Sequence, residues 1–143
     1  MKDMKTVLVV SALAAILCIT LLLSVCSCSP SFPYQGTYTG NWNGSLKVLT
    51  RDVPVTGAIS VIVDSKGVTT GSVSTTGGTV SPATIKGQVD ENGNLSGTVT
   101  FTINGTAFNS NWQGKISKAG NTLGLVGTWS SDHGSGTFSG NSK

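Results

Sequence analysis

The sequence has few charged residues, and this scarcity excludes several classes of function. Only 10% of its 143 residues are Asp, Glu, Lys or Arg, and His133 is the single histidine. After Cys28 there remain seven basic and five acidic residues, and the basic ones stand singly instead of forming a patch. Because binding to nucleic-acid phosphates requires clustered Lys and Arg, we expect no nucleic-acid partner.

The side chains that carry catalysis or hold metals are equally scarce. All five acidic residues after Cys28 fall in expected loops, so no pair of carboxylates faces inward for acid and base roles. His133 follows Asp132 in a short polar segment and is expected to be a solvated turn residue. The segment 90–94 resembles the start of a calcium loop, but its glycine comes one place early and the closing Glu is missing. We therefore expect no catalytic residue, no metal, no cofactor and no enzyme.

Cysteine occurs only three times, and all three residues lie within the first 28 positions. Lys2 and Lys5 precede an apolar run of 19 residues from Val7 to Val25, and small residues follow it. This order is typical of a secretory signal peptide. The run is also long enough to span a bilayer, so an uncleaved transmembrane anchor is the alternative. Under either interpretation the rest of the chain lies outside the cytoplasm.

The end of this run, Val25-Cys26-Ser27-Cys28, resembles the signal of bacterial lipoproteins, in which a cysteine after small residues receives a diacylglyceryl group. The resemblance implies lipidation at Cys28, with Cys26 as the alternative. It divides the chain into a signal peptide (1–27), a lipidated cysteine with its tether (28–34) and a β-domain (35–143). Cleavage at Cys28 leaves one cysteine, so no disulfide framework is needed. Ser29 resembles the sorting residue of outer-membrane lipoproteins in Gram-negative bacteria.

Alternation of apolar and polar residues dominates the exported part and predicts half-buried β-strands. Asn104-Gly105 favours a two-residue hairpin turn, which requires the buried positions to change from odd to even numbers. They do change: Leu95 and Phe101 are odd-numbered, and Trp112 and Ile116 are even-numbered. A five-residue unit recurs in which glycine is the central residue and the first and last residues are apolar. Its glycine always falls on the buried side.

We expect an all-β fold of about eight antiparallel strands in an up-and-down meander, closed into a small β-barrel and preceded by the apolar signal helix. A two-sheet β-sandwich is the alternative. Three-residue loops are expected at 64–67 and 90–93, and a four-residue loop at 118–121, which places Ile116 opposite Leu123. The expected strands cover residues 35–49, 53–63, 68–75, 79–89, 94–103, 106–116, 122–130 and 134–140.

The aromatic residues of the domain fall on the buried face, so core packing is their default role. Glycines on that same face either allow opposite walls to pack tightly or leave room for a ligand. The candidate ligand-facing residues are Tyr38, Trp42, Trp112 and Trp129.

Two resemblances bear on function. Gly40-Asn41-Trp42 and Trp112-Gln113-Gly114 resemble avidin-type barrels, but only over these two stretches. Avidin-like proteins need several polar residues that converge on biotin, and the two stretches do not map them onto this sequence. Across the domain, motifs such as Gly127-Thr128-Trp129-Ser130 resemble exported bacterial envelope proteins built from Gly-rich hairpins. We expect a lipid-anchored, non-enzymatic module of the cell envelope that binds other envelope components. The alternative is a lipocalin-like carrier of a small apolar ligand in the barrel interior.

Overall fold

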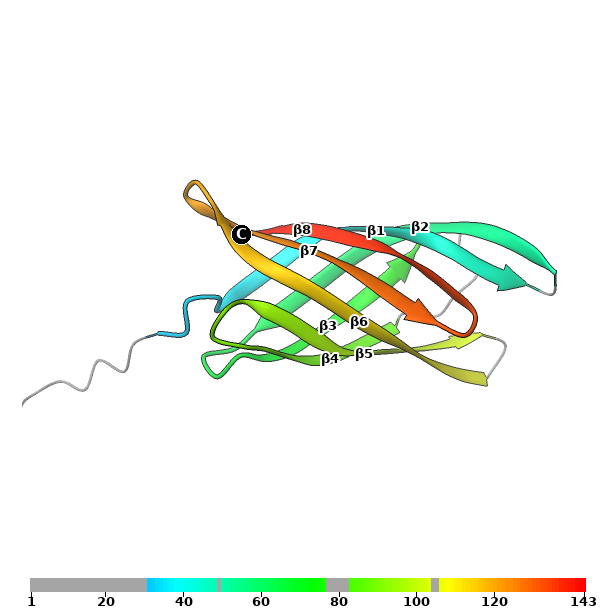
Figure 1. The fold of residues 1–143 in the computed structure, drawn as a ribbon, viewed down its shortest axis with the longest axis horizontal. Coiled ribbons are helices and arrows are strands. Elements are labelled where there is room, and N and C mark those ends of the chain that lie inside the picture. The colour runs from blue at the N-terminus through cyan, green and yellow to red at the C-terminus, as the bar shows by residue number, and fades with distance from the viewer. Residues whose placement is uncertain (1–30, 49, 77–82, 104–105) are drawn as a thin grey trace, which may run out of the picture. The chain divides into compact units, whose positions relative to one another are not determined.

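The computed structural model describes residues 31–48, 50–76, 83–103 and 106–143. The expected signal segment, Cys26 and Cys28 lie outside these residues. Eight antiparallel strands form one closed barrel (Figure 1). The strands are β1 (Gly36–Val48), β2 (Arg51–Val63), β3 (Val68–Thr75), β4 (Ala83–Val89), β5 (Asn94–Ile103), β6 (Thr106–Ala119), β7 (Thr122–Ser131) and β8 (Gly134–Ser142). In the described part of the chain, no helix has the length and apolar character needed to cross a membrane.

Every strand pairs with the next along the chain, and β8 closes the barrel against β1, with Trp42 opposite Phe138. This closure confirms the expected meander and excludes the two-sheet sandwich. It also removes the free strand edges that would otherwise pair with other chains. The change of buried face across the β5–β6 hairpin is confirmed as well, because Ile103 pairs with Thr106 and Trp112 is buried.

Two turns of the same design close one end of the barrel. In each, an Asp carboxylate accepts hydrogen bonds from backbone N–H groups two and four residues later: Asp64 from Lys66 and Val68, and Asp90 from Asn92 and Asn94. A glycine with positive φ follows, Gly67 at 79° and Gly93 at 80°. These are the glycine-containing loops expected from the sequence. Hydrogen bonds from the side chain and backbone of Asn94 also hold the pKa of Asp90 below its usual value.

The expected four-residue loop at 118–121 is wrong. Ala119 pairs with Thr122, which leaves only Gly120 and Asn121 in the turn, and Ile116 lies opposite Leu125 instead of Leu123. Gly120 adopts a φ of 64°, which a tight two-residue hairpin requires. The register therefore shifts by two residues, which leaves every side chain on its expected face. The first part of the expected strand 79–89 lies outside the described residues.

The end of the barrel that carries the two Asp turns is packed solid, and we call it the closed end. Tyr38, Val63, Leu95, Ile116 and Leu125 are each at most 2% exposed there. Phe32 and Tyr34, which precede β1, pack against this core and contact each other edge to face. The Tyr38 hydroxyl donates a hydrogen bond to the backbone carbonyl of Tyr34 at 2.7 Å, which ties the residues just before β1 to the closed end.

This buried tyrosine predicts a loss of stability at alkaline pH. Burial, with the charge of nearby Tyr34 as the second cause, raises the pKa of Tyr38 to about 12. Because an unfolded tyrosine ionises near pH 10, the contribution of Tyr38 to stability is complete below pH 10 and is lost as the pH rises toward 12. By pH 11 the free energy of unfolding should fall by about 1 kcal/mol because of the ionisation of Tyr38.

The measurement is urea unfolding of residues 31–143 between pH 8 and pH 11, for the wild type and for Tyr38→Phe. The variant should lose about 1 kcal/mol at neutral pH with the hydrogen bond to Tyr34, and should lack the alkaline decline. Tyr34→Phe is the control and should keep the decline. Equal pH dependence in wild type and Tyr38→Phe would contradict the assignment.

Candidate ligand-binding cavity

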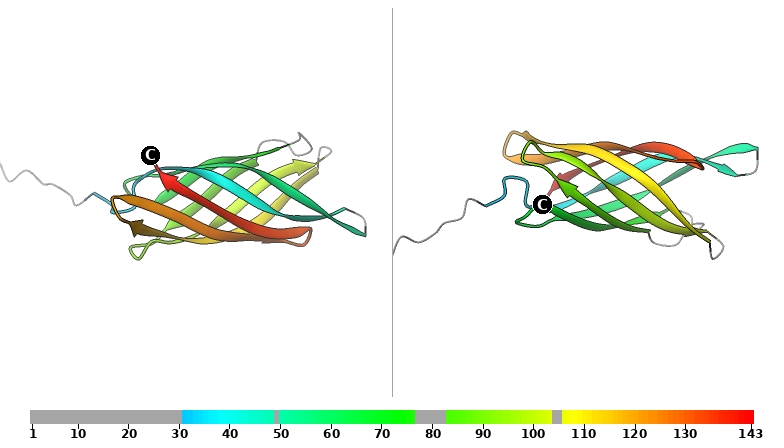
Figure 2. Two further views of the ribbon diagram at one scale, coloured as in Figure 1. Left: turned by 90° about the horizontal axis from the view of Figure 1, so that it is seen from above. Right: turned by 60° about the horizontal axis from the view of Figure 1, so that its bottom comes forward.

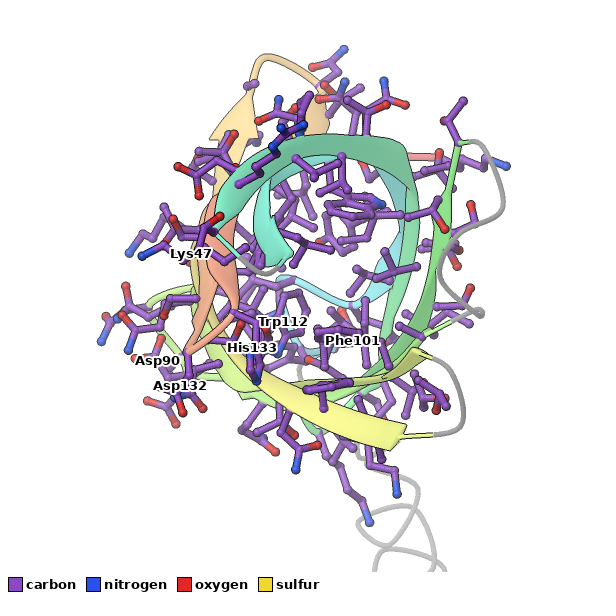
Figure 3. All side chains as sticks on the ribbon, turned by 90° about the vertical axis from the view of Figure 1, so that its right-hand side faces the viewer. Lys47, Asp90, Phe101, Trp112, Asp132 and His133 are labelled. Atoms are coloured by element: carbon purple, nitrogen blue, oxygen red, sulfur yellow. The ribbon has the colours of Figure 1, made fainter. Side chains whose placement is uncertain are left out.

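The opposite end of the barrel is hollow. β1, β3, β5 and β7 end here and β2, β4, β6 and β8 begin here, and we call this end the mouth (Figure 2). The paired strands β1 and β2, and β5 and β6, extend it furthest. Figure 3 looks into the barrel from this side: Trp112 and Phe101 lie inside the ring of strands, whereas Lys47 and Asp132 lie outside it. Residues from all eight strands surround one space.

The cavity is partly open, and its wall is almost entirely apolar. The space available to the centres of water-sized molecules is about 60 Å³, which accommodates roughly four water molecules or part of a small organic molecule. The described residues that line it are Trp42, Leu46, Ile59, Val73, Thr75, Ala83, Val99, Phe101, Ser110, Trp112, Trp129 and Phe138.

Each tryptophan of the wall lies over a glycine of a neighbouring strand. Trp42 stands opposite Gly57, and a Cβ added to Gly57 would lie 2.5 Å from the indole Nε1. Trp129 stands opposite Gly136 with the same 2.5 Å separation. A side chain at either glycine would displace the indole, so these glycines are the reason that the rings can lie flat along the wall. The recurring glycine of the sequence thus shapes the cavity lining.

Backbone hydrogen bonds hold two of the indoles in place. Trp42 Nε1 donates to the carbonyl of Ser74 at 2.9 Å, and Trp129 Nε1 donates to the carbonyl of Asn43 at 3.2 Å. The two rings meet edge to face with centroids 5.8 Å apart. Because one hydrogen bond and one ring contact hold each indole, this part of the wall is ordered before any ligand arrives.

Two polar atoms in the wall have no hydrogen-bond partner. Ser110 Oγ and Trp112 Nε1 are both buried and unpaired, and their residues are 2% and 1% exposed. They stand two positions apart on β6, so both side chains point inward, and Ser110 is the one nearer the mouth. Leaving a buried donor or acceptor unpaired costs about 1–3 kcal/mol, which makes this pair the most unusual feature of the site.

The charged groups of the barrel stay outside the cavity. Among the described lining residues none is ionisable, and the acidic and basic side chains of the strands and turns are exposed. His133 is an exposed residue of the β7–β8 turn, as the sequence predicted. Its ring meets that of Phe108 edge to face, with the ring centroids 4.8 Å apart. The site therefore offers shape, apolar surface and hydrogen bonding, without charge.

The structure brings together three of the four candidate ligand-facing residues. Trp42, Trp112 and Trp129 line the cavity, but Tyr38 is not among the lining residues and lies fully buried in the core of the closed end. The sequence did not single out Ser110, although its even number in 106–116 placed it on the inward face. A lone small polar residue among Phe108, Trp112 and Ile116 is the signal that identifies it.

No protein-family model matches this chain, and no curated protein sequence matches it.

Proposed function

We propose that this chain is a non-enzymatic lipoprotein of the cell envelope whose barrel binds one small, mostly apolar molecule at its mouth. The apolar cavity lined by Trp42 and Trp129 carries the proposal. Small-molecule sites are concave, mostly apolar and largely preformed, with a few well-placed polar groups, and the mouth of a β-barrel is a frequent location for them. A lining without ionisable groups suits a site that binds a molecule and does not catalyse a reaction on it.

The proposal places binding inside the barrel and not on its outer face. The exposed large apolar side chains of the described residues are Val53, Ile62, Val68 and Val126, which are distributed over β2, β3 and β7. Single exposed apolar residues are ordinary on protein surfaces. The cavity is thus the feature that favours a carrier or sensor of an apolar molecule over a module that packs against other envelope proteins.

The experiment is a titration of residues 31–143 with hexane, followed by the fluorescence of the cavity tryptophans. This segment contains all eight strands and forms a compact unit with its own core, so it is the part that folds. We expect a saturable change for the wild type. Ala83→Phe, which fills the cavity from a lining position, should reduce the affinity at least about tenfold, because the ring occupies the ligand's space.

Ala58→Phe is the matched control, since Ala58 is exposed on β2 and its added ring points to solvent. It should bind hexane as the wild type does. Thermal unfolding verifies that both variants are folded. Absence of a saturable signal for the wild type, or equal affinities for wild type and Ala83→Phe, would overturn binding in the cavity.

The envelope location rests on the lipoprotein-type signal and has its own test. Lipoprotein modification attaches the diacylglyceryl group to a cysteine thiol. Cys28→Ser should therefore not be lipidated and should lose metabolic labelling by a radioactive fatty acid. Cys26→Ser should remain labelled. Labelling lost only in Cys26→Ser would move the anchor to that residue, and labelling retained in the double variant would exclude the lipoprotein assignment.

A further inference from the structure

The polar atoms of the cavity wall indicate what kind of molecule the cavity binds. Ser110 Oγ can donate and accept a hydrogen bond, whereas Trp112 Nε1–H can only donate. Both are unpaired and almost completely buried, and both residues line the same cavity. The other two tryptophans of the wall already donate to backbone carbonyls. The unsatisfied hydrogen-bonding capacity of the wall is therefore concentrated on β6.

The position of this pair sets the orientation of the ligand. Trp112 is 1% exposed and packs against Phe138, with ring centroids 5.3 Å apart, so it forms an inner part of the wall. Leu46, Phe101 and Trp42 provide apolar surface around the same space. A bound molecule that forms hydrogen bonds with the two unpaired groups of β6 thus places its polar atom against Ser110 and Trp112. Its apolar part then lies along the remaining wall.

The charge of the ligand follows from the same lining. A carboxylate or an ammonium group in this space would lose its hydration, and none of the described lining residues carries the opposite charge that could compensate. One neutral oxygen needs only the two groups that β6 supplies. Hydroxyl, ketone and ester oxygens all accept from an N–H or O–H donor.

We propose, on the basis of the function proposed above, that the ligand is an uncharged, mostly aliphatic molecule, one oxygen of which hydrogen-bonds to Ser110 and Trp112. Fatty acids in their ionised form and alkylamines are excluded by this assignment, and neutral alcohols, ketones and esters fit it.

The test measures four six-carbon probes on residues 31–143: hexane, hexan-1-ol, hexanoate and hexylammonium, at pH 7. Hexane and hexan-1-ol should both bind, and the two ions should show no measurable binding. Ser110→Ala should weaken hexan-1-ol by about 3- to 10-fold, the usual net effect of one neutral hydrogen bond, and should leave hexane unchanged. Ser130→Ala, on an exposed position of β7, is the matched control and should change neither affinity.

A second readout does not depend on a variant that must fold. In a ¹⁵N–¹H spectrum the indole signal of Trp112 should move downfield with hexan-1-ol and not with hexane, because only the alcohol offers an acceptor. The indole signals of Trp42 and Trp129, whose N–H groups already donate to carbonyls, should show no such difference between the two probes.

The outcomes separate the two proposals. If neither hexane nor hexan-1-ol binds, binding in the cavity itself is wrong, and the ligand assignment falls with it. A second outcome is that both probes bind, that Ser110→Ala weakens their affinities equally or not at all, and that the Trp112 signal does not distinguish them. Binding in the cavity is then supported, and the oxygen assignment is overturned. Binding of hexanoate or hexylammonium as tight as that of hexan-1-ol overturns the neutral class. A long-lived water on Ser110 that persists with the alcohol bound also overturns the assignment.

Discussion

Replacing Gly127 by alanine is expected to destabilise the barrel by about 3 kcal/mol, at the upper end for overpacking, because the new methyl group has no space. A Cβ at Gly127 would collide with the carbonyl oxygen of Gln113 and with the ring of Phe138, and would lie 2.8 Å from the Cα of Gly114. Two of these neighbours are backbone atoms of β6, which cannot move away without breaking their pairing with β7. Phe138 is only 5% exposed and packs against Trp112 with ring centroids 5.3 Å apart, although it also borders the cavity.

Gly124 on the same strand provides the matched control. A Cβ there would meet only the Asn141 side chain at 3.8 Å and the Ser117 carbonyl at 3.9 Å, which are ordinary contact distances. Gly124→Ala should change the free energy of unfolding by less than about 1 kcal/mol, and in the stabilising direction, since alanine restricts the unfolded chain. Urea unfolding of residues 31–143, followed by tryptophan fluorescence, measures both. Similar free energies of unfolding for the two variants would show that close strand approach at glycine does not hold the barrel together.

The sequence predicts the face of almost every side chain, because a period of two and short hairpin turns are both local features. Trp112 and Phe138 are buried as their even numbers require, and Leu95 and Leu125 as their odd numbers require. Closing turns with glycine at positions 67 and 93 were also predictable, since an Asp three residues earlier supplies the acceptor for the turn.

Register and closure were less predictable, because they depend on contacts between distant residues. The two-residue turn at Gly120 and Asn121 shifts the pairing of Ile116 from Leu123 to Leu125 without changing any buried face. Local alternation does not distinguish these registers. Closure of β8 on β1 likewise brings together residues nearly 100 positions apart, such as Trp42 and Phe138, and nothing in either segment alone specifies that pairing.

The division of the interior into a solid half and a hollow half was not predictable from the alternation. Tyr38 and Trp42 are both aromatic residues on the inward face of β1, yet Tyr38 is sealed by Phe32 and Tyr34 while Trp42 borders the cavity. The difference arises from Phe32 and Tyr34, which pack against the core at the closed end. The importance of Ser110 was not predictable for the same reason, because an inward serine is unusual only where its hydroxyl has no hydrogen-bond partner.

Replacing Leu125 by aspartate is expected to abolish folding at neutral pH, whereas the same change at the next residue is expected to be nearly neutral. Leu125 is fully buried in the core of the closed end, opposite Ile116. A carboxylate there loses its hydration without gaining a partner, at a cost of several kcal/mol, which is comparable with the roughly 5–15 kcal/mol that stabilises a typical domain. The measurements are the yield of folded protein and urea unfolding of residues 31–143.

Val126 is 55% exposed and stands opposite Lys115 on β6. Val126→Asp therefore places a carboxylate in water beside a cation, and the free energy of unfolding should change by less than about 1 kcal/mol. The two substitutions introduce the same group one position apart, so their difference measures the alternation of faces directly. Two variants of equal stability would mean that β7 does not present alternate residues to a common interior.

The pH dependence of Leu125→Asp provides an independent check on the cause. Burial favours the neutral carboxylic acid and raises its pKa in the folded state, so the penalty is smallest below the unfolded value of about 3.9 and grows as the pH rises above it. Folded protein should therefore be recovered in part near pH 3. Leu125→Asn has nearly the same shape without an ionisable group and should be destabilised to a similar degree at both pH values. If both variants respond alike to pH, the destabilisation comes from the changed shape of the side chain and not from the buried charge.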